Sequence, residues 1–172
     1  MKKYYLYFKK EKLKKGVALL FAIVISMILF TILTGVLSIS LKETIFSISI
    51  KNSNDAFYAA DGAVECALLN DKVGETVFAY DSSGNISCFN SSFPVTKAGS
   101  DINQSFDFVV SFPENNACAK VNLKKEYDLN VDPMGDPVLI NTMILSRGYN
   151  RGGAACDQSG LKSAERVLEV TY

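Results

Sequence analysis

The apolar residues of this chain are distributed unevenly, and the longest uninterrupted run lies near the N-terminus. From Val17 to Leu41 the sequence contains no Asp, Glu, Lys, Arg or Pro. This run of 25 residues exceeds the roughly 20 that a helix needs to cross a bilayer. At about 1.5 Å per residue the helix would be on the order of 37 Å long, enough to span with some tilt. Five hydroxyl residues lie in the run and can bond to carbonyls of their own helix: Ser26, Thr31, Thr34, Ser38 and Ser40.

Beyond this run the apolar residues recur at spacings of three and four, which is typical of one face of an amphipathic helix. They are Leu41, Ile45, Ile48, Phe57, Ala60, Val64 and Leu68. Segment 46–50, FSISI, alternates as a strand would, and the polar segment 51–54 could also interrupt a helix. Because no Gly or Pro occurs between Leu41 and Asp61, we predict one helix from about Val17 to about Lys72. Gly74 is its expected stop.

From residue 74 onward the pattern changes to short alternating segments separated by polar turns. Segments 81–85 and 92–104 are rich in Ser, Gly, Asn and Asp and are predicted to be loops. Four strands are expected as an antiparallel meander: 105–112, 117–127, 138–149 and 165–172. The residues expected to face inward are Phe106, Phe108, Val110, Phe112, Ala119, Val121, Leu123, Tyr127, Leu168, Val170 and Tyr172.

The predicted fold is therefore α+β, with a long N-terminal helix packed on a small antiparallel sheet. The sheet needs a partner that buries its apolar face, and the apolar stripe of the helix from Phe57 to Leu68, which also contains several alanines, is expected to pack against it. The chain then has four parts: a basic leader (1–16), an apolar helix half (17–41), an amphipathic helix half (42–73) and a β-rich head (74–172).

Charge is as unevenly distributed as the apolar residues. Seven lysines precede the apolar run against one acid, Glu11, and this excess holds the N-terminus in the cytoplasm and places the head outside. They are Lys2, Lys3, Lys9, Lys10, Lys12, Lys14 and Lys15. Residues 17–172 carry 11 basic and 17 acidic residues, so we expect no general nucleic-acid surface. Lys120, Lys124 and Lys125 form one small basic strip, interpreted as a solvated strand face.

The four cysteines all follow the apolar run, on the exported side. There an even set favours two disulfides, for which three pairings are possible. In the predicted meander Cys118 opens the second strand beside the end of the third, and Cys156 follows that end. Cys66 and Cys88 are close in sequence across the connection from helix to sheet. The order of the elements thus predicts the pairs Cys66–Cys88 and Cys118–Cys156.

Candidate catalytic and metal-binding chemistry is sparse. The chain has no His, which removes the commonest general base, and its scattered acids give no reason to expect an enzyme or a cofactor. Alternating oxygen ligands suggest a calcium loop: Asp128, Asn130, Asp132 and Asp136. Pro133 and Leu139 stand where an EF-type loop needs Gly and a bidentate Glu, so a solvated loop without metal is the expectation.

Three interpretations compete for the N-terminal segment. A secretory signal peptide would have an apolar core of roughly 7–15 residues and a prompt small-residue cleavage site, and this run is too long. A plain signal anchor fits the hydropathy but leaves the junction before the run unexplained. That junction, Lys14-Lys15-Gly16-Val17, resembles the class III leader junction of type IV prepilins. The resemblance implies cleavage after Gly16 by a prepilin peptidase and methylation of the new N-terminus at Val17.

Three further stretches strengthen this resemblance. Segment 55–68, DAFYAADGAVECAL, resembles the "AF-x-AA-[DE]-x-x-x-E-x-A" stretch of non-major, tip-type pilin-like proteins. SRGYN (146–150) and ERVLEVTY (165–172) resemble the closing strands of the same group. Major pilins usually carry Glu as the fifth residue of the processed chain, whereas that position is Phe21 here. The resemblance therefore implies a minor subunit.

Three functional hypotheses follow. The first is a minor, tip or initiating, subunit of a type IV pilus or related pseudopilus, whose helix leaves the membrane to pack against other pilin subunits. Small residues in the run suit such close helix contacts: Ala18, Ala22, Ser26, Gly35 and Ser38. The second is a permanently anchored single-pass surface protein whose β-domain binds a ligand. The third is a filament-tip module that binds DNA or a host surface, although the acidic head weighs against DNA.

Overall fold

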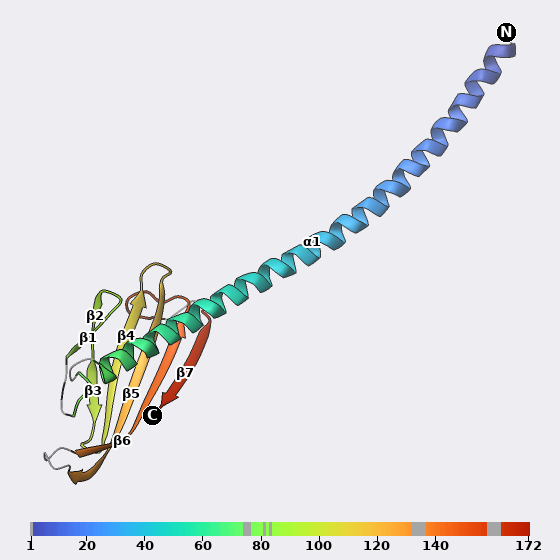
Figure 1. Ribbon diagram of the computed structural model, residues 1–172. Coiled ribbons are helices and arrows are strands. Elements are labelled where there is room, and N and C mark those ends of the chain that lie inside the picture. The colour runs from blue at the N-terminus through green and yellow to red at the C-terminus, as the bar shows by residue number, and fades with distance from the viewer. Residues whose placement is uncertain (1, 74–76, 81, 83, 132–136, 158–162) are drawn as a thin grey trace. The chain divides into compact units, whose positions relative to one another are not determined.

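The computed structural model describes residues 2–73, 77–80, 82, 84–131, 137–157 and 163–172, with the backbone alone for residues 2–15 and 129–131. Its elements are α1 (Lys2–Lys72), β1 (Asn85–Cys88), β2 (Ser91–Pro94), β3 (Thr96–Gly99), β4 (Asn103–Phe112), β5 (Ala117–Val131), β6 (Pro137–Tyr149) and β7 (Glu165–Thr171) (Figure 1). The chain divides into two compact units between Ser47 and Ile48, so α1 contributes to both.

The single helix that the apolar spacing predicts is present and extends further than expected. Helix α1 includes segments 46–50 and 51–54, so neither interrupts it, and it runs through Gly16 back to Lys2. Lys, Leu and Glu are good helix formers, and a single Gly costs only about 1 kcal/mol relative to Ala. After the helix ends, the Val73 amide donates to the Leu69 carbonyl at 3.0 Å. The expected stop, Gly74, lies outside the described residues.

Five strands form the main sheet in the order β3-β4-β5-β6-β7, and every neighbouring pair is antiparallel. The predicted meander corresponds to β4–β7. The loop prediction for 92–104 was wrong, because this segment contains β3 and part of the separate β1–β2 sheet. Each missed strand has only four residues, too few to give an alternating signal. Phe89 and Asn90 between β1 and β2 have φ of 52° and 59°, the left-handed geometry of a tight hairpin turn.

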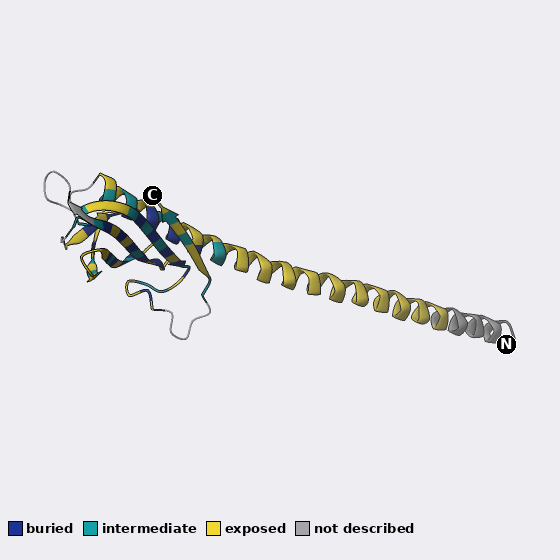
Figure 2. Ribbon diagram, turned by 90° about the horizontal axis from the view of Figure 1, so that it is seen from below, coloured by how far each residue is buried: buried dark blue, intermediate teal, exposed yellow. Residues whose placement is uncertain are grey.

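The core of the head lies between the sheet and residues 48–72 of α1. Figure 2 shows buried and exposed residues alternating along the strands. The predicted inward faces of β4 and β5 are confirmed by the burial of Phe106, Phe108, Val110, Ala119, Val121, Leu123 and Tyr127. Phe78, which precedes the strands, packs edge-on to Phe106 and stacks on Phe108, with ring centroids 5.4 and 5.8 Å apart. Burying one such ring stabilises a fold by about 1.5–3 kcal/mol.

A row of small residues makes the contact between α1 and β6. Ala56, Ala59, Ala60 and Ala63 are at most 3% exposed. A Cβ added at Gly148 of β6 would overlap the Ala56 carbonyl oxygen and the Ala60 amide nitrogen, and would lie 2.8 Å from the Ala60 Cβ. The backbones of helix and strand therefore touch, which only glycine on one side and alanine on the other permit.

This close approach corrects the predicted apolar stripe. Phe57, expected to face the sheet, is 42% exposed, because the helix face that packs on the sheet is centred on the alanines at 56, 60, 63 and 67. Val64 is buried and Leu68 is half-buried, as expected. In addition, the Ser146 hydroxyl of β6 donates to the Ala60 carbonyl at 2.9 Å. The contact between α1 and the sheet is thus made mostly by alanines and this hydrogen bond, and less than expected by large apolar side chains.

The last strand is held to the helix by polar contacts as well as by apolar ones. Arg166 donates to the Ser53 hydroxyl oxygen through Nε at 3.0 Å and through Nη2 at 2.6 Å. Leu168 and Val170 are half-buried, whereas Tyr172 is 39% exposed. The predicted inward row is therefore correct in direction for all three residues, since the Tyr172 hydroxyl reaches Asp71 at the end of α1 while its ring remains partly in solvent.

Two disulfides close the head. Cys66–Cys88 joins α1 to β1, and Cys118–Cys156 joins the start of β5 to the loop after β6, with Cα–Cα distances of 5.8 and 5.6 Å. These are the pairs that the order of the elements predicts, since Cys118 stands in register with Tyr149, where β6 ends. Each can stabilise the head by about 3 kcal/mol through loop closure. A long N-terminal helix packed on a disulfide-closed antiparallel sheet is the predicted α+β, pilin-like arrangement.

Candidate functional site: an exposed apolar helix and a polar head

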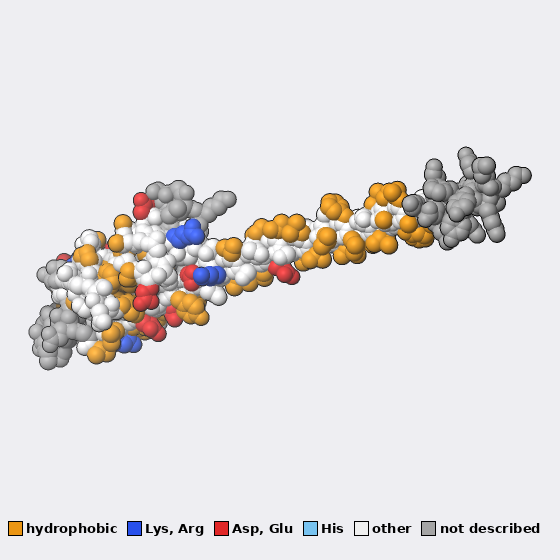
Figure 3. Space-filling view, turned by 90° about the horizontal axis from the view of Figure 1, so that it is seen from above, with side chains coloured by type: hydrophobic (Ala, Val, Ile, Leu, Met, Phe, Trp, Pro, Cys, Tyr) orange, Lys and Arg blue, Asp and Glu red, His pale blue; other side chains and the backbone are white. Residues whose placement is uncertain are grey.

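The first unit consists of helix alone, and its apolar side chains have no protein cover. From Val17 to Ile45 the large apolar side chains are 45–69% exposed. Figures 2 and 3 show this segment as exposed and lined with hydrophobic side chains. Within the part of the chain that the structure describes, α1 is the one helix long and apolar enough to cross a membrane. Since exposed apolar surface costs about 25 cal/mol per Å2 in water, this segment requires lipid or other protein around it.

The hydroxyl groups of this segment bond within the helix, as the sequence predicts. Ser26 donates to the Ala22 carbonyl at 2.7 Å, and Thr31 donates to the Ile28 carbonyl at 2.8 Å. The Thr34 hydroxyl lies 3.1 and 2.9 Å from the carbonyl oxygens of Phe30 and Thr31. An unpaired buried hydroxyl would cost roughly 1–3 kcal/mol. These three groups therefore place no penalty on transferring the helix between lipid and a protein interior.

The expected processing site lies on an open stretch of helix. Gly16 and Val17 are both within α1, and Val17 is exposed. A Cβ added at Gly16 would meet no described atom within 4 Å, so folding does not require glycine at this position. Phe21, the fifth residue after the junction, is exposed as well. The first acid after Gly16 in the sequence is Glu43.

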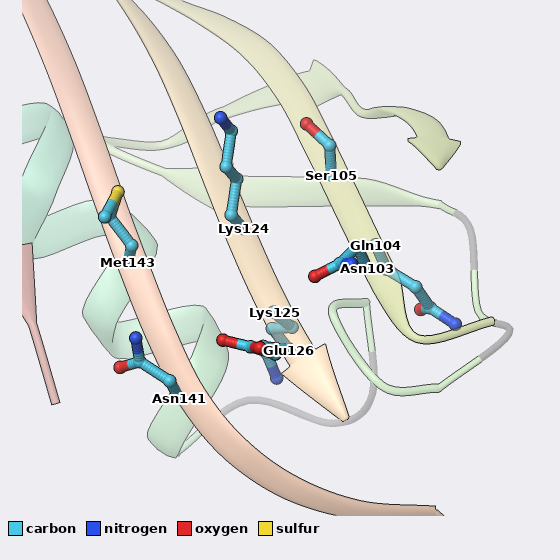
Figure 4. Close-up of a pocket in the computed structure, with 8 residues that line it drawn as sticks. All are labelled: Asn103, Gln104, Ser105, Lys124, Lys125, Glu126, Asn141 and Met143. Atoms are coloured by element: carbon cyan, nitrogen blue, oxygen red, sulfur yellow. The ribbon is translucent and has the colours of Figure 1, made fainter. Parts of the chain in front are cut away.

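A hollow of about 300 Å3 lies over β4, β5 and β6 (Figure 4). Ser105, Lys124 and Met143 are neighbours in register, and Figure 4 shows their side chains projecting to one side of the sheet. The full lining is Asn103, Gln104, Ser105, Lys124, Lys125, Glu126, Asn141 and Met143. Its amides, hydroxyl, ammonium and carboxylate can form hydrogen bonds to a small polar ligand.

The structure separates the three lysines of the predicted basic strip. Lys120 and Lys124 are exposed, whereas Lys125 is buried and pairs with Asp71 of α1, with Nζ 2.5 Å from Oδ1. Placing Lys125 on a solvated face was therefore wrong. Side chains alternate between the faces of a strand, so the buried neighbours Leu123 and Tyr127 already assign residue 125 to the inward face. That alternation was the signal that could have identified the buried lysine.

Asp71, Lys125 and Tyr172 form a polar group at the end of α1, which we call the Asp71 cluster. The Tyr172 hydroxyl donates to Asp71 Oδ2 at 2.6 Å, and the Lys72 ammonium lies 4.1 Å from the centroid of the Tyr172 ring. Burial raises the pKa of Tyr172 well above its ordinary value, and the bond to Asp71 raises it further. Burial, followed by the charge of Asp71, raises the pKa of nearby Tyr127 to about 12. Both phenols are therefore protonated at neutral pH.

The candidate calcium ligands are only partly covered by the structure. Asp132 and Asp136 lie outside the described residues, and Asn130 is described by its backbone alone. Asp128 lies in β5, in register with Val138 of β6. Over the described ranges, no group of three or more His, Cys, Asp or Glu side chains could hold a metal ion. Calcium binding by this segment stays a hypothesis from the sequence.

No protein-family model, curated protein or solved structure matches this chain. Four features of the chain bear on its function: the glycine junction, the uncovered apolar helix, the disulfide-closed sheet and the Asp71 cluster.

Proposed function

We propose that this protein is a minor subunit, tip or initiating, of a type IV pilus or a related pseudopilus. The lysine-rich leader holds the N-terminus in the cytoplasm, and the head is exported. A prepilin peptidase removes residues 1–16, and the amine of Val17 is methylated. The chain is then a protease substrate and an assembly subunit, not an enzyme. The observation that supports this most is one continuous helix whose first half is apolar and uncovered and whose second half belongs to the head.

The proposed assembly step exchanges one apolar environment for another. In the membrane the side chains from Val17 to Leu41 contact lipid, and in the filament they contact the helices of neighbouring subunits. Full burial of one Leu, Ile or Phe side chain is worth about 1.5–3 kcal/mol relative to water, so neither state leaves the segment exposed. Small residues such as Ala22 and Gly35 allow neighbouring helices to approach closely. The internally bonded hydroxyls support the same exchange.

Phe21 supports a minor role within such a filament. A free amine buried among apolar helices is costly unless a negative charge lies beside it. Between Gly16 and Glu43 the chain has no acid, so its apolar helix cannot supply that charge to a neighbouring subunit. A subunit of this kind fits a position at the end of a filament better than repeated positions along it.

The N-terminus of the native protein tests the proposal directly. We expect protein extracted from membranes and from sheared filaments to begin at Val17 with a methylated amine, as read by N-terminal sequencing and mass spectrometry. Gly16→Leu should abolish cleavage, because a bulky side chain prevents the close approach of protease to backbone that glycine allows. The folded chain has room for a side chain at Gly16, so lost cleavage would not reflect misfolding.

Gly35→Leu is the matched control. Gly35 is also helical, and a Cβ there meets no described atom within 4 Å, but it lies beyond the junction, so cleavage should be normal. Normal cleavage of the Gly16→Leu protein would contradict the proposal. A native protein that retains its lysines and stays in the bilayer as a single chain would replace it with the permanently anchored surface protein.

A further inference from the structure

The two edges of the five-stranded sheet differ in charge and in how far they are paired. One edge is β7, and its seven residues include three charged ones, which discourage pairing with another chain. They are Glu165, Arg166 and Glu169. At the other edge, β3 pairs with β4 only as far as the register of Thr96 with Asp107. Segment 108–112 of β4, FVVSF, carries no charge and pairs with β5 on one side, while no described strand pairs with it on the other.

Half of the backbone groups of this segment point toward its open side. The Ser100 amide donates to the Asn103 carbonyl at 3.0 Å across the turn between β3 and β4, so these two residues form a hydrogen-bonded pair. Such pairs recur at every second residue of an antiparallel ladder. The odd-numbered residues of β4 therefore direct their N–H and C=O groups toward the side of β3. Beyond Asp107 these are Val109 and Ser111, and within the described ranges neither forms a backbone hydrogen bond on that side.

A hollow of about 650 Å3 lies beside these open backbone groups. Strand β2 lines its opposite side, because the chain pairs with β1 up to Pro94 and joins β4 only from Thr96 onward. The volume is within the range of about 300–1,000 Å3 that is usual for ligand pockets. Since β2 occupies the place where a neighbouring sheet would continue, the hollow admits a single extended segment rather than the edge of another folded sheet.

We propose that an extended peptide segment of a partner protein binds in this hollow as an added strand, paired with Val109 and Ser111 of β4. Open N–H and C=O groups at strand spacing recognise the backbone of another strand. The side chains of the added strand alternate between the two faces of the sheet. Phe93 and Phe108 line the hollow from the core side, whereas Lys120 lines it and is exposed. The partner segment therefore alternates apolar residues, facing the core, with polar ones.

Proline substitution tests the pairing, because proline has no N–H group and is tolerated on the open side of an edge strand. Val109→Pro removes an N–H group that the fold leaves unpaired. Val167→Pro is the matched control at the other edge. The backbones of Thr142 and Tyr172 exchange hydrogen bonds of 2.9 and 3.0 Å, so the odd-numbered residues of β7 direct their N–H groups away from β6. Val167 is thus open in the same way, but it does not line the hollow.

The probe is a phage-displayed library of random linear peptides, selected on the full chain in detergent after depletion on empty micelles. Selected sequences are made as synthetic peptides, and fluorescence anisotropy measures their binding. We expect equal affinity for the unmodified and Val167→Pro proteins, and affinity at least about tenfold lower for Val109→Pro, which has lost a hydrogen bond and gained a ring at the contact. Methylation of alternate backbone nitrogens of the peptide should abolish binding, because it removes the N–H groups that pair with β4.

Several results would overturn the proposal: no selected peptide, equal binding by the Val109→Pro protein, or binding that methylation of the peptide backbone leaves unchanged. Dimers of the unmodified chain that Val109→Pro abolishes would overturn it in favour of a second copy at this edge. If Val109→Pro fails to fold, the methylated peptides decide alone on the unmodified chain. The inference depends on the head alone, so it would stand if the chain were never cut at Gly16, and its failure would not affect the proposed function.

Discussion

The two halves of α1 share one secondary structure but have opposite surroundings. Between Val17 and Ile45 the apolar side chains are large and uncovered, whereas between Ala56 and Ala67 the buried face consists mainly of alanine against a strand backbone. This difference in side-chain size follows from what each half of the helix packs against. A long side chain can adapt to lipid tails or to another helix, but only a small one fits against a backbone whose position is set by the same fold.

Because of this difference, substitutions in the two halves of α1 should affect different properties of the protein. In the head, each buried atom has a defined neighbour, so removing or adding one changes the free energy of unfolding. In the apolar half, the neighbours lie outside the chain, so a change there should affect membrane insertion or assembly and leave the head intact. Paired substitutions of the same chemistry can test this separation.

The largest contrast is expected from one leucine in each unit. Leu123 is 0% exposed in the core and Leu29 is 55% exposed in the apolar half. Leu123→Ala should lower the free energy of unfolding by about 3 kcal/mol through lost burial and a cavity. Leu29→Ala should change it by less than about 0.5 kcal/mol. Denaturant unfolding of the full chain in detergent, followed by the near-ultraviolet signal of the head, measures both. Equal losses would mean that the two units are not energetically separate.

A smaller contrast is expected from one glycine in each unit. Gly148→Ala places a methyl group where the α1 backbone lies and should cost about 2 kcal/mol or more. Gly35→Ala adds the same group where no described atom is near and should stabilise the helix slightly, by up to about 1 kcal/mol. The same unfolding assay distinguishes them. A stable Gly148→Ala protein would show that helix and sheet can separate without penalty.

The smallest effect is a dependence on alkaline pH that belongs to the head alone. The pKa of Tyr127 is raised from 10.0 to about 12 in the folded head, so between these values the unfolded state loses a proton that the folded state keeps. The contribution of Tyr127 to the free energy of unfolding is therefore fully present below pH 10 and is lost as the pH rises toward 12. Unfolding of the unmodified chain and Tyr127→Phe, compared at pH 9 and pH 11, should show a smaller pH effect in the variant. If the free energy of unfolding fell equally between pH 9 and pH 11 in both proteins, Tyr127 would not be a cause of the pH dependence.

The spacing of apolar residues was sufficient to predict the long helix and strands β4–β7, because those elements are long enough for their periods to repeat. It was insufficient for β1, β2 and β3, whose four residues each complete no pattern. The error at Phe57 has a tertiary cause, since only the packing of Gly148 against Ala56 and Ala60 reveals which face of the helix is buried. At Lys125 the alternation of side chains indicates the inward face, whereas the charge of lysine favours the solvated one.

The candidate sites also differ in whether the sequence alone predicts them. The two disulfides could be predicted because strand order brings Cys118 near Cys156, and because Cys66 and Cys88 are close in sequence across the connection from helix to sheet. The Asp71 cluster could not, because it joins residues from α1, β5 and the C-terminal residue, and nothing local in the sequence connects them. The significance of Gly16 depends on an enzyme that would act on the chain, so it cannot be derived from the fold.

The position of Cys66 determines how tension would travel through the molecule. It lies six residues before the end of α1 and is bonded covalently to Cys88. A pull on α1 would therefore reach β1 through a covalent bond, in addition to the noncovalent contacts of Ser53 with β7 and of Ala60 with β6. Under oxidising conditions, loss of the noncovalent contacts alone would leave α1 attached to β1.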